Sequence, residues 1–215
     1  MSSYKSKELQ AFDLKIKQNS LKISKDKIFH KKSLEWMIYA EKYRYVYNFK
    51  WMGLPIIKYP NDILALQEII WSTKPDIIIE TGIAHGGSIV FIASILNMIN
   101  PKAKVIGIDL EIRDYNLREI KKNKFYNKNI KLIKGSSVDR KVISKIKKHI
   151  NRKKVMVILD SAHSHDHVLK ELNIYSKLVS KNMFLIVEDT FEEFYPKNFF
   201  GHLKTTKVRP ETNKG

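Results

Sequence analysis

The stretch DIIIETGIAHGGSIVFIASILNMINPKAKVIGID, residues 76–109, decides the fold. It begins with a short apolar run at 76–80 and ends with a second one at 104–109, and polar residues bound both runs. Residues 87–99, between the two runs, have the length and the apolar spacing of a helix. A strand, a helix and another strand in this order predict a βαβ unit, in which the two strands lie parallel.

The same alternation continues toward the C-terminus. Further apolar runs typical of buried strands lie at 130–134, 155–159 and 183–187. Segments of helical length lie at 114–124, 139–150 and 166–180. We therefore predict an α/β fold with a Rossmann-like, doubly wound, mostly parallel sheet and right-handed crossovers. Ligands of such sheets bind at the carboxyl ends of the strands, so the residues at those ends are the candidate site.

The chain before this region has a different pattern. Residues 6–48 carry apolar side chains at helical intervals and predict helices. Asn61 or Asp62 is expected to cap a further helix that runs to about Ser72. We predict a helical arm at 1–50, one α/β domain at 51–200 and an irregular tail at 201–215.

Composition excludes several kinds of chemistry. The 215 residues, 43% of them hydrophobic, can bury one sizeable core. Because the chain has no cysteine, disulfides, thiolate catalysis and cysteine-based metal sites are excluded. The N-terminal residues lack the apolar core of a signal peptide, and no apolar run is long enough to span a bilayer. A cytoplasmic location is therefore expected.

The formal net charge of +18 raises nucleic acid as a partner. The basic residues are spread through every segment, however, which indicates biased residue usage more than a binding groove. The densest stretch, residues 121–134, interleaves Phe125 and Tyr126 with lysines, as nucleic-acid surfaces can. We interpret it as a solvated helix end and loop, and no nucleic-acid partner is expected.

A glycine-rich turn, ETGIAHGGS at residues 80–88, follows the first strand. It is neither the G-x-G-x-x-G fingerprint of dinucleotide binding nor a P-loop. The acidic Glu80 suits a cationic or zwitterionic ligand better than a pyrophosphate. The amino and sulfonium groups of S-adenosylmethionine fit such a field, although the turn could also be only a tight connection. The candidate cofactor contacts here are Glu80, Thr81, Gly82, His85, Gly86, Gly87 and Ser88.

The next two strands end in further candidate cofactor residues. A carboxylate at Asp109 can accept hydrogen bonds from both hydroxyls of a ribose. Ser136 and Ser137 follow the third strand, where their hydroxyls could contact an adenine edge. The serine pair could equally be a helix cap in front of Asp139.

Three carboxylates end the last two strands. Asp160 follows VMVIL, and Glu188 and Asp189 follow MFLIV, so all three are expected at one edge of the sheet. Carboxylates at the ends of buried strands need a cationic partner, and a divalent ion such as Mg²⁺ takes oxygen ligands. The alternative is that these acids form salt bridges with nearby lysines.

Three histidines follow Asp160 at alternating positions. The segment with His163, His165, Asp166 and His167 also resembles a metal-hydrolase pattern. His85 is the only obvious extra ligand for such a metal site. Alternatively Ser164 or Asp166 caps the next helix, and His163 or His165 acts as a general base near the site.

The motifs ETGIAHGGS, VIGIDLEIR, GSSVD, LDSAHSHDHV and VEDT, in this order, resemble the cephalosporin hydroxylase and rhamnosyl O-methyltransferase family over roughly residues 45–195. The resemblance implies the fold of the class I methyltransferases and methylation of hydroxyl groups on sugars or antibiotic scaffolds. It also implies S-adenosylmethionine contacts and a magnesium site. The residues carried over are Glu80, Gly82, Ser88, Asp109 and Ser136 or Ser137 for the cofactor, and Asp160, Glu188 and Asp189 for the metal.

We therefore expect an O-methyltransferase that uses S-adenosylmethionine and Mg²⁺, with Asp160, His163 and His165 as catalytic candidates and a role in surface-polysaccharide biosynthesis. A metal-dependent hydrolase and a noncatalytic cofactor- or nucleic-acid-binding protein are the alternatives. The family normally continues with further strands after Phe200, so a shortened C-terminal end and an exposed last strand are expected here. We also expect a homo-oligomer.

Overall fold

The computed structural model describes residues 6–190 and residue 194. The chain forms two compact units, Met1–Tyr45 and Val46–Gly215. The predicted arm at 1–50 and domain at 51–200 place the boundary slightly later, and the predicted tail at 201–215 lies outside the described residues. None of the described helices is long and apolar enough to cross a membrane.

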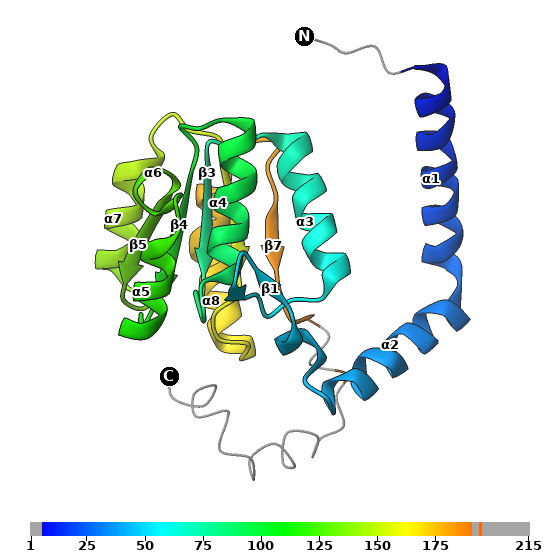
Figure 1. The fold of residues 1–215 in the computed structure, drawn as a ribbon, viewed down its shortest axis with the longest axis horizontal. Coiled ribbons are helices and arrows are strands. Elements are labelled where there is room, and N and C mark those ends of the chain that lie inside the picture. The colour runs from blue at the N-terminus through cyan, green and yellow to red at the C-terminus, as the bar shows by residue number, and fades with distance from the viewer. Residues whose placement is uncertain (1–5, 191–193, 195–215) are drawn as a thin grey trace. The chain divides into compact units, whose positions relative to one another are not determined.

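The first unit consists of two helices, as its apolar spacing predicts. They are α1 (Lys7–Lys25) and α2 (Lys27–Glu41), both labelled in Figure 1. Asp26 lies between them, and its carboxylate accepts hydrogen bonds from the amides of Ile28 and Phe29, both at 2.9 Å. This cap fixes the start of α2.

The second unit begins with a lead-in segment that reaches the sheet. It contains the short helix η1 (Tyr45–Asn48), the antiparallel strands β1 (Lys50–Trp51) and β2 (Leu54–Pro55), and α3 (Pro60–Thr73). The predicted cap of α3 at Asn61 or Asp62 is wrong, because the helix begins at Pro60 with Tyr59 in the cap position. Proline suits the first helical position, since its φ is fixed and no amide is needed there.

Five parallel strands form the central sheet in the order β5-β4-β3-β6-β7. They are β3 (Ile77–Thr81), β4 (Lys104–Asp109), β5 (Ile130–Lys134), β6 (Val155–Leu159) and β7 (Leu185–Val187). The helices that follow β3 are α4 (Gly87–Ile99), α5 (Asp114–Lys122), α6 (Tyr126–Asn129), α7 (Arg140–Ile150), α8 (His165–Tyr175) and η2 (Ser176–Leu178). The Rossmann-like α/β prediction is confirmed.

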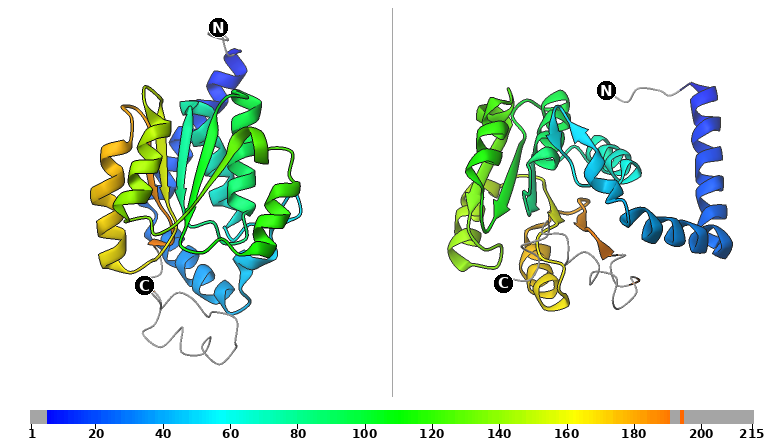
Figure 2. Two further views of the ribbon diagram at one scale, coloured as in Figure 1. Left: turned by 90° about the vertical axis from the view of Figure 1, so that its left-hand side faces the viewer. Right: turned by 60° about the horizontal axis from the view of Figure 1, so that its bottom comes forward.

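Helices cover both faces of this sheet, as Figure 2 shows. On one face, α3 and α4 pack on the strands through residues such as Ile70 and Phe91. On the other face, α7 and α8 pack through residues such as Ile146 and Tyr175. Because β3 and β6 are buried along their whole length, the polar residues at their ends stand out as candidates for a site.

The last strand is shorter than its apolar run. β7 covers Leu185–Val187 only, and it is the edge of the sheet among the described residues. The helix expected at 166–180 ends at Tyr175 and continues as η2. The oligomeric state stays a prediction.

Candidate active site

Strands β3 and β6 meet backbone to backbone at the glycine-rich turn. Gly82 has φ +87°, and a Cβ atom there would lie 1.8 Å from the carbonyl oxygen of Asp160. The amide of Asp160 donates in turn to the carbonyl of Thr81 at 3.0 Å. Only glycine fits this contact, so the turn fixes the position of Asp160.

A second close contact brings the lead-in segment to the same edge. A Cβ atom at Gly87 would lie 2.1 Å from the carbonyl oxygen of Pro55. Gly87 therefore lets the chain after β2 cross directly over the start of α4. Lys58, three residues further, then reaches the strand ends.

Lys58 is a central residue of this site that the sequence analysis missed. Its side chain is 4% exposed, and its ammonium lies 2.9 Å from Asp160 Oδ2 and 3.0 Å from Glu188 Oε1. The sequence offers nearby lysines as partners for these acids, whereas Lys58 lies 102 residues before Asp160 in the chain. The available signal was three acids at buried strand ends, since such acids need a buried cation.

The charges of this cluster shift the pKa values of its members. Burial opposes the charged form of Lys58, but the attraction of Asp160 and Glu188 outweighs it and raises the pKa of Lys58 above its usual range. Burial also raises the pKa of Asp160, although Lys58 counteracts that rise. Lys58 therefore stays protonated at neutral pH and cannot act as a base.

Glu80 lies fully buried at the end of β3. The hydroxyl of Ser88 donates to its Oε1, whereas its Oε2 is buried and has no hydrogen-bond partner among the described residues. Burial raises the pKa of Glu80 to about 8, although Lys58 opposes this rise. A buried acceptor without a partner is costly, so this oxygen fits a ligand that brings a hydrogen-bond donor or a positive charge.

Glu80 makes stability depend on pH. Its pKa is raised from 4.5 to about 8 in the folded chain, so the unfolded chain loses this proton first as the pH rises. We expect the free energy of unfolding to fall between pH 4.5 and 8, by up to about 1.4 kcal/mol per pH unit. Chemical denaturation across this range should show the fall in the wild type, a smaller fall in Glu80→Gln, and the same fall as in the wild type for the exposed Glu119→Gln. An identical slope in Glu80→Gln would contradict this assignment.

Three side chains at the ends of β6 and β7 form a group that could hold a metal ion. Asp160, His163 and Asp189 offer ligand atoms that all lie within 4.8 Å of one another. His163 Nε2 lies 3.3 Å from Asp189 Oδ2, and Asp189 has a left-handed backbone with φ 56°. Of the three predicted metal ligands, Asp160 and Asp189 belong to this group, whereas Glu188 is paired with Lys58.

Asp109 organises the glycine-rich turn. Its Oδ2 accepts hydrogen bonds from the amides of Ile83 at 2.8 Å and Ala84 at 3.4 Å, and its Oδ1 accepts one from Glu111 at 3.0 Å. Each carboxylate oxygen has two lone pairs, so these contacts leave acceptor capacity for a ribose. Contact with a ribose stays a prediction.

The other residues predicted to bind the cofactor lie around this turn, where they contact other residues of the protein. Thr81 is buried and its hydroxyl accepts a hydrogen bond from the amide of Asp160 at 3.2 Å. His85 Nδ1 lies 3.2 Å from Asn116 Oδ1. Gly86 has φ +86° and occupies the cap position of α4.

Ser137 and His167 belong to a polar network behind the strand ends. His167 Nε2 lies 3.1 Å from the hydroxyls of both Ser137 and Ser161, and Ser161 donates to the buried Glu171 at 2.8 Å. The hydroxyl of Tyr175 donates to the carbonyl of Ser137 at 2.8 Å. The alternative that the serine pair Ser136-Ser137 caps the helix is wrong, because Asp139 caps α7.

Only one of the three neighbouring histidines joins the acids. The side chain of His165 is 85% exposed, and its Nδ1 lies 3.2 Å from Asp166 Oδ1. Ser164 occupies the cap position of α8 without a side-chain hydrogen bond. Within the described part of the chain, the single group of potential metal ligands is therefore the one around Asp160, which does not match a dinuclear hydrolase site.

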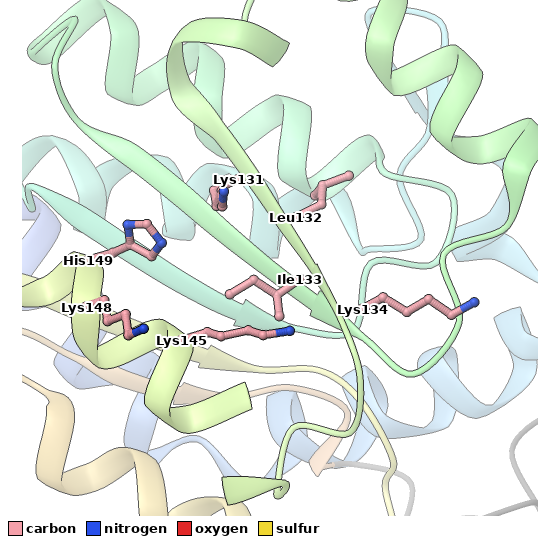
Figure 3. Close-up of a pocket in the computed structure, with 7 residues that line it drawn as sticks. All are labelled: Lys131, Leu132, Ile133, Lys134, Lys145, Lys148 and His149. Atoms are coloured by element: carbon pink, nitrogen blue, oxygen red, sulfur yellow. The ribbon is translucent and has the colours of Figure 1, made fainter. Parts of the chain in front are cut away.

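A separate hollow lies at the β5 edge of the sheet, against α7. Figure 3 shows its lining, and its volume is about 400 Å³. The lining residues are Lys131, Leu132, Ile133, Lys134, Lys145, Lys148 and His149. None of these residues belongs to the strand-end site.

The parallel five-stranded sheet with helices on both faces is the α/β fold of the class I methyltransferase type. A family model described as Rhamnosyl O-methyltransferase/CmcI matches residues 43–212. The chain belongs to this family.

The matching proteins are longer than the matched region. The Rhamnosyl O-methyltransferase of Mycobacterium tuberculosis H37Rv is 31% identical over 160 residues, which are 70% of this chain and 63% of the relative. Its Mycobacterium leprae counterpart is 30% identical over 142 residues, or 65% of this chain and 59% of the relative. This chain thus spans less than two thirds of either relative.

A solved CmcI structure, described as containing Mg-SAM, has the same fold. It superimposes with a TM-score of 0.50 at 21% sequence identity, covering 74% of this chain and 66% of that chain.

Proposed function

We propose that this chain is an O-methyltransferase that uses S-adenosylmethionine and acts on a hydroxyl group of a small molecule or sugar. The observation that carries the proposal is the buried, unpartnered Oε2 of Glu80 beside a glycine turn. A cofactor with an ammonium group and a sulfonium group supplies both a donor and positive charge there. The family membership and the names of the relatives support the same class of reaction.

The chain's own residues hold the cofactor in this proposal. Gly82 and Gly86 have positive φ angles, and a Cβ atom at either would collide with Asp160 or Ile120, so glycine at both positions gives the turn its shape. Glu80 would accept the ammonium, which would favour its ionised form, and Asp109 would accept the ribose hydroxyls. S-adenosylmethionine supplies a methyl group on a positively charged sulfur.

The residues at the ends of β6 and β7 act on the acceptor. Asp160 and Asp189 provide carboxylate oxygens on the open side of the strand ends, where they would hold a divalent ion such as Mg²⁺. The chemistry that such an ion supplies is polarisation of a hydroxyl oxygen. Lys58 fixes Asp160 in place, and catalysis then depends chiefly on positioning the acceptor.

The proton of the acceptor hydroxyl needs a receiver, because alcohols are poor nucleophiles at neutral pH. His163 lies at the site, with its Nε2 3.3 Å from Asp189 Oδ2, and is the candidate. His165 is an exposed residue and is the weaker of the predicted catalytic histidines. For the acceptor itself we propose a sugar hydroxyl of a glycan, by analogy with the rhamnosyl methyltransferases.

Calorimetric titration with S-adenosylmethionine and S-adenosylhomocysteine tests the proposal. We expect micromolar binding by the wild type and a loss of about 10- to 100-fold in Asp109→Ala, because hydrogen bonds to a charged group are removed. Asp76→Ala is the matched control, since Asp76 also accepts a backbone amide, from Lys154 at 2.9 Å, but precedes β3 at its amino end. A folded wild type that binds neither compound would refute the proposal.

A further inference from the structure

We propose that Asn116 is a positioning residue for the glycine-rich turn. In this proposal it holds the turn in its binding shape and fixes His85 in the tautomer whose Nε2 accepts a hydrogen bond from a donor group of S-adenosylmethionine. The inference rests on the proposed function, because it concerns how the same site takes up the cofactor. Asn116 lies on α5, 31 residues after His85 in the chain, and the sequence analysis did not identify it.

Helix α5 buries two of its side chains, and both of them meet the glycine-rich turn. They are Asn116 and Ile120, which lie four residues apart and therefore on one face of the helix. A Cβ atom at Gly86 would collide with the side chain of Ile120, so this isoleucine packs directly against the turn. Asn116 is 6% exposed. A buried amide is costly unless it is hydrogen-bonded, so the partners of Asn116 indicate its role.

These partners determine how the amide of Asn116 is oriented. Its Nδ2 donates to the carbonyl of Ala84 at 2.7 Å, and its Oδ1 lies 3.2 Å from His85 Nδ1. A carbonyl oxygen only accepts, so the amide must present Nδ2 to Ala84 and Oδ1 to His85. An amide oxygen also only accepts, so the proton of the neutral His85 ring must lie on Nδ1. The Nε2 of His85 then carries a lone pair and is a hydrogen-bond acceptor.

Ala84 has a backbone conformation that its neighbours must hold. Its φ is 44°, in the left-handed region that residues with a Cβ atom rarely adopt. Its amide donates to Asp109 Oδ2 at 3.4 Å and its carbonyl accepts from Asn116, so both of its backbone polar groups are bound. Strained backbone of this kind clusters at ligand-binding segments. Loss of Asn116 would free the carbonyl and let the turn relax away from its binding shape.

The second ring nitrogen of His85 is left for a ligand. The side chain is partly exposed, and its Nε2 has no hydrogen-bond partner among the residues that the structure describes. S-adenosylmethionine carries an ammonium group and ribose hydroxyls, all of which donate hydrogen bonds. A lone pair fixed at Nε2 suits these donors, whereas the other neutral tautomer would present an N–H group to them.

Nitrogen-15 NMR of the full chain tests the tautomer without an activity assay. The long-range ¹H–¹⁵N spectrum of the histidine rings distinguishes the two neutral tautomers from each other and from the protonated ring, and His85→Gln assigns the signal. We expect the wild type to carry the His85 proton on Nδ1, and the Nε2 signal to shift when S-adenosylhomocysteine is added. A proton on Nε2, or an Nε2 signal that does not move on binding, would overturn the inference.

Variants of Asn116 separate positioning from general stability. Calorimetry with S-adenosylhomocysteine should give at least about tenfold weaker binding in Asn116→Ala, together with a mixture of His85 tautomers. Asn116→Asp keeps an acceptor opposite Nδ1 and should restore the wild-type tautomer. Asn129→Ala is the matched control, because Asn129 is also buried and its Nδ2 donates to the carbonyls of Pro101 and Ala103, at 3.2 and 2.8 Å. It should lower stability but change the affinity by less than about twofold.

The outcomes distinguish this inference from the proposed function. Equal affinity for S-adenosylhomocysteine in the wild type, Asn116→Ala and Asn129→Ala would overturn the inference and leave the methyltransferase proposal standing. A folded wild type that does not bind the compound would overturn both. If Asn116→Ala fails to fold, the wild-type spectra with and without S-adenosylhomocysteine decide the inference.

Discussion

Replacing Gly82 by alanine is expected to lower the free energy of unfolding by more than about 4 kcal/mol and to abolish cofactor binding. The added Cβ would lie 1.8 Å from the carbonyl oxygen of Asp160, and this neighbour is backbone that cannot rotate away. The φ of +87° adds strain for any L side chain. Strands β3 and β6 would have to separate, which would also displace Asp160.

Gly53→Ala is the matched control for this experiment. Gly53 has nearly the same φ, +88°, but a Cβ atom there would meet nothing within 4 Å. Its substitution should therefore cost only the backbone strain, about 1–2 kcal/mol. Urea denaturation of the three proteins, with calorimetry of S-adenosylmethionine binding, gives the comparison. Equal losses in Gly82→Ala and Gly53→Ala would show that the contact with Asp160 is unimportant.

The sequence was sufficient to predict the sheet because its central strands β3 and β6 are buried on both faces. Runs such as 155–159 are continuously apolar, and the helices between them have amphipathic spacing, so local patterns and the fold agree. The ends of strands were also predictable, because polar residues stop each run. This is why Glu80, Asp109 and Asp160 could be named as candidates.

The partners of those residues could not be predicted in the same way. Lys58 lies in an irregular segment, and its position depends on the close contact of Gly87 with Pro55, which no periodicity reveals. Among forty basic residues, nothing in the sequence distinguishes Lys58, which is buried. The pairing of Glu188 with Lys58 follows from that one contact, so it could not be predicted.

Trp51 of the lead-in segment shows the same limit, because no periodicity reveals the partners of its side chain. Its ring packs edge-on against Phe91 with centroids 4.9 Å apart, and its indole nitrogen donates to Ser94 at 3.2 Å. Trp51 thus fixes the lead-in segment on α4, which helps to hold Lys58 at the strand ends.

Replacing Lys58 by methionine is the second large effect that we expect. Methionine keeps most of the volume but leaves Asp160 and Glu188 without their buried cation, and removal of one partner from a buried ion pair costs about 3–5 kcal/mol. The loss should be largest near pH 8 and smaller near pH 5, because protonation removes the unpaired charges as the pH falls. Lys122→Met is the control, since its pair with Glu119 is exposed and should contribute less than about 1 kcal/mol.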